Sequence, residues 1–413
     1  MNRESKAAQL NTVWQFAISG SIKFGRGCRF QLAEEIQRRK LKRPLVVTDT
    51  TLLQLEIVSQ LLEQLGDFVL FDGGVAEPSV AIAEAAISEA AIAAAGSGEV
   101  DCVVGIGGGS NLDVAKITAN VLRNGGSAQD YFGFDNVPGP TLPVFALPTT
   151  SGTGSEVSHS AVLTDELAGV KVSTLSQWLR PSMAIVDPAL TDSCPKRVTA
   201  ESGIDALVHA VEAFTNRDFS EMSGVDPQAR AYEGSYRLTK MLAAEAIRLV
   251  GQSLEMLIAD PTPALRDDMA LAATLAGMAF SNSGVGIVHA LEYPIGALTH
   301  CGHGEGNGLL LPHVMRYNRG VREAEFAEIA TLLLGDKQLK VDFNSAQMAD
   351  FAIELVEVMQ RRIGIRTQLR ELGMSADAIQ ELAAKSFEIK RLMDINPRTP
   401  TQSDLEDILR AAY

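Results

Sequence analysis

The stretch DCVVGIGGGSNLDVAKITANVL, from Asp101 to Leu122, decides the fold. It begins with a run of Val and Ile typical of a buried strand, passes through three consecutive glycines and continues as a helical pattern. Glycines at a strand-to-helix turn let backbone N–H groups approach a pyrophosphate, and the helix N-terminus adds partial positive charge. Ser110 is a good N-cap residue. A tight turn without a ligand would look the same, but the position after a buried strand favours a phosphate-binding turn at Gly107, Gly108, Gly109 and Ser110.

Similar apolar runs lie on both sides of this stretch, each flanked by turn residues. Between the earlier ones lie helical patterns at about 49–66 and 80–95. Alternating strands and helices predict a parallel sheet covered by helices. The other predicted strands are PLVVTD (44–49), DFVLFD (67–72), PVFALP (143–148) and MAIVDP (183–188).

From about Arg197 onward the strand patterns stop. Apolar residues then recur every three or four positions, as in amphipathic helices. We therefore predict an α/β dinucleotide-binding domain with a parallel, Rossmann-like sheet over residues 1–190, followed by an all-α domain over residues 191–413. A cleft between two such domains is a natural place for a site.

Composition excludes several classes of function. The chain has 413 residues, is 46% hydrophobic and carries a formal net charge of −15. An acidic chain repels phosphate backbones, so nucleic acid is not an expected partner. The four cysteines form no C-x-x-C pair and are expected to be reduced thiols. No apolar leader is visible, and the Ala-rich stretch 80–95 is too short and too charged to span a bilayer. We expect a soluble, cytoplasmic protein with no membrane partner.

Two further features fit a dinucleotide. The loop PTTSGTGSE (148–156) follows a predicted strand and offers hydroxyls and glycines for a ribose or phosphate, although an ordinary turn has the same composition. Asp49 ends the predicted strand at 44–49, where a carboxylate can accept a hydrogen bond from an adenosine ribose and would repel a 2′-phosphate. That position favours NAD over NADP, but Asp49 could equally cap the next helix.

Four side chains suit a metal ion. Asp205 and His209 lie four residues apart in a helical pattern, so they point from one face. His289 and His303 follow in segments rich in glycine and apolar residues. Three nitrogens and one oxygen suit a divalent transition metal, and the spacing does not choose between Fe(II) and Zn(II). For the first pair alone, an internal Asp–His hydrogen bond is the simpler interpretation.

These segments together resemble the iron-containing (group III) alcohol dehydrogenases, in particular the lactaldehyde reductase and 1,3-propanediol dehydrogenase branches. The resemblance rests on GGGSNLDVAK, PTTSGTGSEVS, GIDALVHAVEAF, GMAFSNSGVGIVHALEYPIGALTHCGHGEGNGLLLPHVMRYN and the late NPR, in order over nearly the whole chain. It implies a site in the cleft between an N-terminal dinucleotide-binding domain and a helical metal-binding and substrate domain. It also implies a homodimer or larger homo-oligomer.

The resemblance assigns residues by position. It implies that the metal ligands are Asp205, His209, His289 and His303, and that Lys171 reaches the nicotinamide ribose. The implied cofactor contacts are Asp49, Gly108, Gly109, Ser110, Asp113, Thr149, Thr150, Ser151 and Thr153.

One position departs from the family. Many relatives carry a second histidine four residues after the first, in HxxxHPLG, where it is often treated as part of a proton relay. Here the pattern reads His289-Ala-Leu-Glu-Tyr293-Pro-Ile-Gly. Tyr293 is either a packing substitution or a phenol that binds or protonates the substrate.

The expected activity is metal-dependent hydride transfer between NAD(H) and a small alcohol, aldehyde or ketone, with Tyr293 and His289 as the candidate catalytic residues. One alternative is a hydroxyacid–oxoacid transhydrogenase that retains its NAD. Another is a lyase of the dehydroquinate synthase type, for which Lys390 and Arg391 offer no dense basic cluster. A silent binding protein is disfavoured, because buried ligands are costly to keep unpaired. By default, His300 lies at the surface or behind a ligand, and His313 is a core residue.

Overall fold

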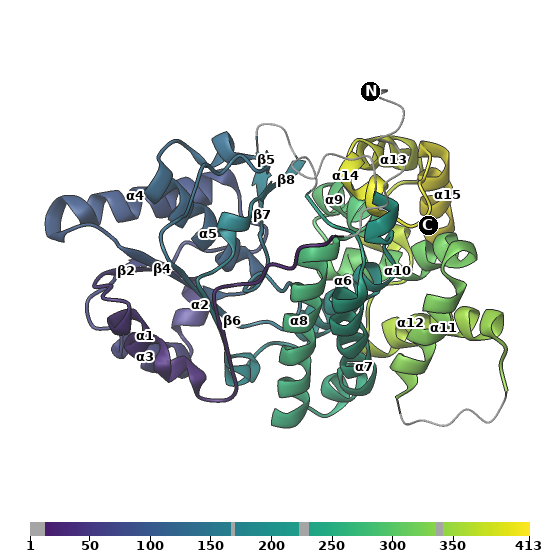
Figure 1. The fold of residues 1–413 in the computed structure, drawn as a ribbon, viewed down its shortest axis with the longest axis horizontal. Helices are drawn as coiled ribbons and strands as arrows, with labels where there is room; N and C mark the ends of the chain where they lie inside the picture. Colours follow the sequence, from purple (N-terminus) through teal and green to yellow (C-terminus); the bar gives the residue numbers. More distant parts are fainter. Residues whose placement is uncertain (1–12, 167–169, 223–230, 336–341) are drawn as a thin grey trace. The chain divides into compact units, whose positions relative to one another are not determined.

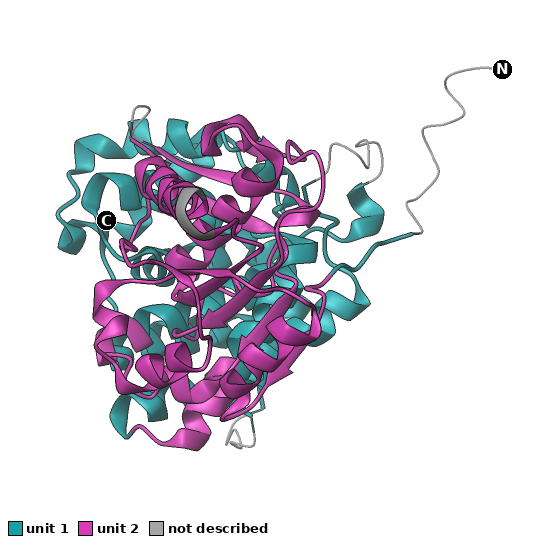
Figure 2. Ribbon diagram, turned by 90° about the vertical axis from the view of Figure 1, so that its left-hand side faces the viewer, with its two compact units in different colours: residues 1–17, 200–260, 271–413 teal, residues 18–199, 261–270 magenta. Residues whose placement is uncertain are grey.

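The computed structural model describes residues 13–166, 170–222, 231–335 and 342–413 (Figure 1). These residues divide into two compact units (Figure 2). Unit 2 comprises residues 18–199 and 261–270, and unit 1 comprises residues 1–17, 200–260 and 271–413. The predicted boundary between two domains at residue 190 is not tested by this division into units, and it stays a prediction.

Unit 2 is built on a six-stranded, fully parallel sheet in the order β1-β9-β6-β4-β2-β3. Five of its strands were predicted from their apolar runs; the edge strand β1 was not, because three residues carry too little pattern to detect. The strands are β1 (Ile22–Phe24), β2 (Pro44–Val47), β3 (Val69–Phe71), β4 (Cys102–Gly107), β6 (Val144–Pro148) and β9 (Met183–Val186).

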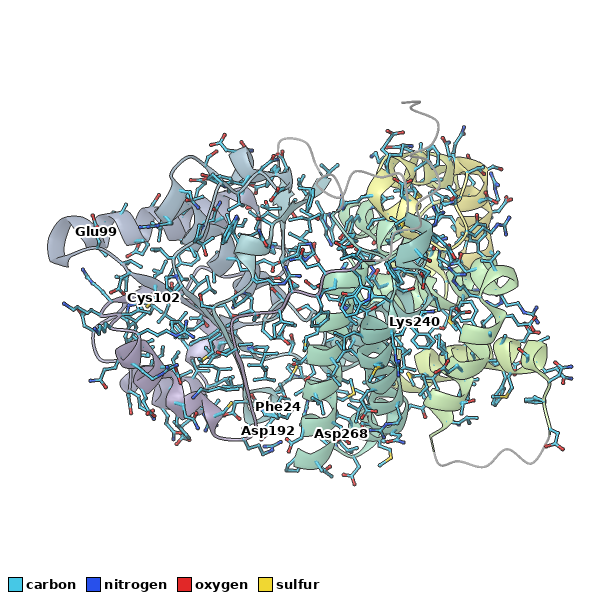
Figure 3. The ribbon with its side chains drawn as sticks, viewed as in Figure 1. Phe24, Glu99, Cys102, Asp192, Lys240 and Asp268 are labelled. Carbon is cyan, nitrogen blue, oxygen red and sulfur yellow. The ribbon has the colours of Figure 1, made fainter. Side chains whose placement is uncertain are left out.

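Helices cover both faces of this sheet. Alternate residues of a strand point to opposite faces, so Val103 packs toward α4 and α5 whereas Val104 packs toward α1 and α3. Cys102 is accordingly buried, while Glu99 before the strand is exposed (Figure 3). The covering helices are α1 (Leu32–Arg38), α2 (Thr50–Leu53), α3 (Glu56–Glu63), α4 (Val80–Ser97) and α5 (Gly109–Asn124).

The helix predicted at 49–66 is two helices. α2 ends before Leu55, which has extended backbone angles (φ −84°, ψ 125°), and α3 begins one residue later. A three-stranded sheet in the order β5-β8-β7 was also missed, because β5 has only two residues and the other two strands, SAVLTD and VKVSTL, lack a continuous apolar run. These strands are β5 (Gly133–Phe134), β7 (Ser160–Asp165) and β8 (Val170–Leu175).

Unit 1 is largely helical, as predicted. α6 and α8 begin among residues of unit 2, and the other helices lie within unit 1. The helices are α6 (Lys196–Thr215), α7 (Arg237–Ala259), α8 (Pro263–Ser283), α9 (Ile287–Thr299), α10 (His303–Asn318), α11 (Glu323–Leu334), α12 (Ser345–Ile363), α13 (Ile379–Phe387), α14 (Lys390–Ile395) and α15 (Gln402–Ala412).

Two glycines let α10 lie unusually close to α6. A Cβ atom on Gly304 would lie 2.0 Å from the Glu201 carbonyl oxygen, and one on Gly308 would lie 2.8 Å from Ile204. Because real Cβ atoms do not approach so closely, any larger residue would separate the helices. The first and last glycines of HGEGNG therefore follow from packing against α6, whereas a Cβ atom on Gly306 would lie 2.9 Å from the Glu292 side chain on α9.

Among the described residues, no single helix is long and apolar enough to cross a membrane. The pair α8 and α9 passes that test only jointly, by length and composition, and is bent by 105° at the break between them.

Candidate dinucleotide cradle and metal centre

The glycine turn lies at the carboxyl end of β4, where phosphate groups bind in parallel α/β sheets. Gly107 has φ 149°, and a Cβ atom on it would lie 2.2 Å from Asn111 Nδ2, so only glycine fits. The N-cap of α5 is Gly108, so the prediction that Ser110 caps this helix is wrong. Ser110 instead lies within the first turn, because the helix starts as soon as the chain leaves the sheet.

The hydroxyl-rich loop after β6 lies beside the glycine turn. Thr149 N donates to Gly107 O (3.0 Å). A Cβ atom on Gly109 would lie 2.7 Å from the Thr153 side chain, so this glycine leaves room for the threonine. The Ser151 hydroxyl oxygen is buried and makes no hydrogen bond to the described residues. A buried hydroxyl with unused hydrogen-bonding capacity beside a glycine turn fits a bound dinucleotide.

An ion pair between Asp113 and Lys116 on α5 (3.6 Å) lies against this loop and is hydrogen-bonded to it. Asp113 accepts from Ser155 Oγ (2.6 Å) and Val162 N (2.9 Å), and Lys116 donates to Ser155 Oγ (2.7 Å). Burial raises the pKa of Asp113, although Lys116 opposes that rise, and burial lowers the pKa of Lys116 to about 8. Both carboxylate oxygens of Asp113 therefore accept hydrogen bonds from the protein itself, and the bond from Ser155 helps to fix the hydroxyl-rich loop.

Asp49 has one of its two predicted roles in the structure, that of a helix cap, and the contact with a ribose stays a prediction. Its Oδ1 caps α2 by accepting from Thr51 N (3.0 Å) and Leu52 N (2.9 Å), and its Oδ2 accepts from Asn111 Nδ2 (2.9 Å). The capping interpretation is correct, and the bond to Asn111 places the carboxylate at the first turn of α5. Lys171, on β8, forms an ion pair with Glu77 (2.7 Å).

The four candidate metal ligands come from three helices of unit 1: α6, α9 and α10. Ligand atoms of Asp205, His209 and His289 all lie within 4.8 Å of one another, and all three residues are buried. The Nε2 atoms of His209 and His289 are 3.0 Å apart. His303 joins them through the Asn307 amide, whose nitrogen lies 3.1 Å from His303 Nε2, 3.2 Å from His289 Nε2 and 2.8 Å from Asp205 Oδ1.

Two carboxylates that the sequence analysis missed set the tautomers of these histidines. His289 Nδ1 lies 2.7 Å from Glu212 Oε2, and His303 Nδ1 lies 2.5 Å from Glu292 Oε2. A carboxylate that accepts the Nδ1 proton puts the lone pair of each imidazole on Nε2, the atom through which it would bind a metal. The signal was present in the spacing, because Glu212 and Glu292 each follow a candidate ligand by three residues on the same helix.

This donor set fits a divalent cation. Asp205 Oδ1 and two Nε2 lone pairs converge on one amide nitrogen that has only two protons, so a cation would satisfy acceptors that the amide cannot. Burial opposes ionisation of Asp205, but the positive charge that the imidazoles of His209, His303 and His289 carry when protonated, together with the Asn307 amide, outweighs it and lowers the pKa of Asp205. The carboxylate is therefore held in the ionised form that metals bind.

Tyr293 lies one turn after His289 on α9. Its ring centroid is 6.1 Å from that of His303, with an angle of 26° between the ring planes. The ring of Tyr293 therefore lies next to that of a candidate ligand, and its role in catalysis stays a prediction.

Of the two default assignments, His313 is only partly buried in α10, and desolvation lowers its pKa to about 4. His300 has left-handed angles (φ 53°) at the end of α9.

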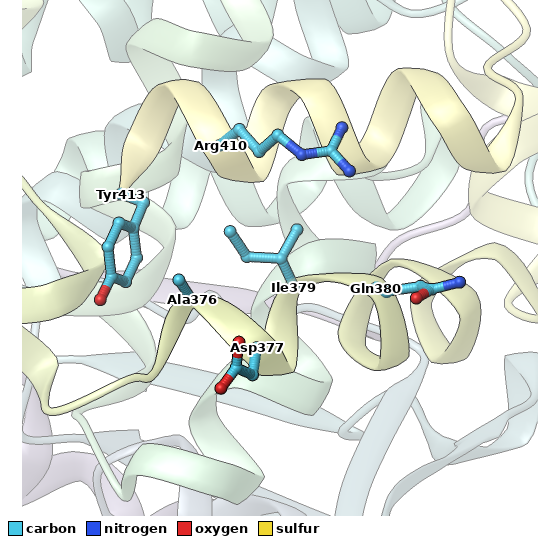
Figure 4. A pocket seen from close by; sticks show the side chains of 6 residues that line it. All are labelled: Ala376, Asp377, Ile379, Gln380, Arg410 and Tyr413. Atoms are coloured by element: carbon cyan, nitrogen blue, oxygen red, sulfur yellow. The ribbon is translucent and has the colours of Figure 1, made fainter.

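A separate groove of about 460 Å³ lies between α13 and α15 (Figure 4). Its lining contains none of the predicted site residues. It is lined by Ala376, Asp377, Ile379, Gln380, Arg410 and Tyr413.

Comparison with known proteins identifies the family. Residues 19–188 match the iron-containing alcohol dehydrogenase family, and residues 199–413 match its C-terminal part. The chain belongs to the iron-containing alcohol dehydrogenases, a family of NAD-dependent enzymes.

Several relatives are similar over nearly their full length. A long-chain-alcohol dehydrogenase of Geobacillus thermodenitrificans is 37% identical over 94% of each chain. The lactaldehyde reductase of Escherichia coli is 31% identical over 94% of this chain and 97% of its own. The crystal structure of a 1,3-propanediol oxidoreductase superposes with a TM-score of 0.88 at 30% identity, covering 97% of this chain and 100% of the other. These matches confirm the resemblance and the fold class inferred from the sequence.

Proposed function

We propose that this enzyme transfers hydride between NAD(H) and a small primary or secondary alcohol, or the corresponding aldehyde or ketone. We further propose that it uses Fe(II) held by Asp205, His209, His289 and His303. The observation that carries the proposal is the buried set of donors, in which two histidines are each backed by a carboxylate. Such backing orients an imidazole for a metal and is unnecessary for packing alone.

A divalent metal held by these donors would supply Lewis acidity toward an alcohol or carbonyl oxygen, and a bound nicotinamide would supply or accept the hydride. The protein does the positioning. Glu212 and Glu292 keep the Nδ1 protons in place, and the ionised Asp205 contributes the negative charge. Tyr293, adjacent to His303, is the candidate for binding or protonating the substrate oxygen.

In the cofactor half, we propose that Gly107, Gly108, Gly109 and Ser110 hold the pyrophosphate through the first turn of α5. The neighbouring hydroxyls of Thr149, Thr150, Ser151 and Thr153 are proposed to contact the phosphates and riboses. Support comes from the hydrogen bond between Thr149 and Gly107 and from the packing of Thr153 on Gly109.

The test is NADH oxidation by iron-reconstituted protein against short aldehydes and 2-oxo acids, with NADPH as the control cofactor. We expect turnover of an aldehyde with NADH. His289→Ala should lose bound iron and turnover together, because it removes one ligand of the set. His300→Asn is the matched control, since Asn tolerates the left-handed backbone at that position. An active His289→Ala protein with full metal content would refute the assignment.

A transhydrogenase is the second candidate, favoured by Tyr293 at the position where many relatives have histidine. It predicts NAD that copurifies with the protein and exchange between a hydroxy acid and an oxo acid without free NADH. The lyase alternative gains no support from Lys390, whose ammonium lies 3.4 Å above the Phe387 ring rather than in a basic cluster.

A further inference from the structure

Asn111, in the first turn of α5, connects the ends of two adjacent strands. It is 3% exposed, and its amide nitrogen donates to Asp49 Oδ2 (2.9 Å) after β2 and to Ile106 O (3.1 Å) in β4. Asp49 and Asn111 are 62 residues apart in sequence. The bond therefore ties the candidate ribose carboxylate to the candidate pyrophosphate turn.

Two turns are shaped around this amide. A Cβ atom on Gly107 would lie 2.2 Å from Asn111 Nδ2, and one on Gly74 would lie 2.1 Å from Asn111 Oδ1. Gly74 N also donates to Thr48 O (3.0 Å), directly before Asp49. The amide of Asn111 therefore fits between the ends of β3 and β4 only because both positions are glycine, and this close packing fixes its orientation.

The carboxylate of Asp49 is thereby left with little freedom. Thr51 N and Leu52 N donate to Oδ1, and Asn111 donates to Oδ2. A carboxylate offers about four lone-pair sites, so these three bonds leave about one acceptor site in a fixed direction. Asp49 is itself only partly buried, so a ligand can reach that site.

We propose that Asn111 is a positioning residue that orients Asp49 toward the adenosine ribose and so sets the preference for NAD over NADP. The inference rests on the proposed dinucleotide site in unit 2. A fixed carboxylate accepts a bond from a ribose 2′-hydroxyl and repels a 2′-phosphate at the same place. Without Asn111, Oδ2 loses its only described protein donor, and the carboxylate can turn away from the ribose.

The experiment measures the dissociation constants of NADH and NADPH by cofactor fluorescence, with no substrate present. For Asn111→Ala we expect NADH binding to weaken by about 5- to 10-fold. This is slightly less than the loss of one hydrogen bond to a charged group would give, because water can replace part of the lost bond. NADPH binding should stay unchanged or tighten, so the preference for NADH falls by at least that factor. Asn124→Ala is the matched control, because Asn124 lies at the other end of α5 and donates only to Asn120 Oδ1 among its described partners.

A second comparison separates positioning from folding. Asn111→Ser keeps a small polar side chain that is too short to reach Asp49, and it serves if the alanine variant fails to fold. Asp49→Asn, alone and combined with an Asn111 variant, completes a double-mutant cycle. Positioning through Asp49 predicts that the Asn111 change has little further effect once Asp49 is replaced.

The outcomes are distinct. A lower melting temperature with an unchanged NADH-to-NADPH ratio would mean that Asn111 is merely structural, and would overturn the inference. Additive effects in the cycle would also overturn it. If the wild-type protein binds neither cofactor, the proposed function itself fails and the inference falls with it.

Discussion

At the scale of single residues, the geometry of the candidate metal site depends on two carboxylates that are not themselves candidate ligands. Glu212 serves two purposes, because Oε2 faces His289 Nδ1 while Oε1 accepts from Val288 N (2.8 Å). It therefore fixes both the imidazole and the start of α9. Glu292, which is fully buried, holds His303 in the same way.

Replacing these carboxylates should weaken metal binding. For Glu212→Gln and Glu292→Gln we expect about 10- to 100-fold lower affinity, because an amide holds the Nδ1 proton less well. The measurement is competition for Co(II) against a chromophoric chelator, read from the metal's absorption spectrum. Glu328→Gln, an exposed position on α11, is the control. Wild-type affinity in both variants would show that the carboxylates only pack.

A second residue-scale prediction concerns acid stability. Burial, reinforced by Arg316 and opposed by Glu357, lowers the pKa of His313 to about 4, below its ordinary value of 6.5. Between pH 6.5 and 4 the unfolded chain binds a proton at this position that the folded chain does not, so the free energy of unfolding falls as the pH falls. His313→Gln removes this contribution.

The check is thermal unfolding of both proteins across that range. The melting temperature of His313→Gln should fall less on acidification than that of the wild type, by a few degrees. Parallel curves for the two proteins would contradict a lowered pKa at the partly buried His313.

At the scale of elements, the approach of α10 to α6 sets the spacing between two ligand-bearing helices. Gly304→Ala would bring a methyl group to 2.0 Å from a backbone oxygen that cannot move independently of α6. We expect a loss of about 1–3 kcal/mol in unfolding free energy, or more, together with reduced metal content. Gly320→Ala is the control, since nothing lies within 4 Å of its Cβ position. Equal stability of the two variants would show that α10 moves without cost.

The elements were predictable to different degrees. β2, β4 and β6 have every residue buried, so each appears as a continuous apolar run that sequence analysis detects. The break between α2 and α3 carries no glycine or proline, and tertiary packing rather than local propensity places it. Asp205 and His209 lie on a predicted helix and could be paired from their spacing, whereas His289 and His303 were added on residue type and on the family resemblance. The contact between Asn111 and Asp49 depends on strand order, which local patterns do not contain.

At the scale of the whole molecule, the two candidate chemistries use different parts of the chain. The glycine turn, Asp49 and the hydroxyl-rich loop belong to unit 2, and the four candidate ligands belong to unit 1. Each set is held by hydrogen bonds within its own unit. Neither set therefore needs the other's ligand in order to form.

Metal removal should accordingly separate binding from turnover. After treatment with a chelator we expect turnover to be lost, because the donors that support the metal chemistry are empty, while the dissociation constant of NADH stays within about twofold of its starting value. The measurement is NADH fluorescence titration before and after chelation, with metal content determined on the same samples. Restoring Fe(II) should recover activity, which shows that the protein stayed folded. Loss of NADH binding together with the metal would show instead that the cofactor site depends on the metal centre.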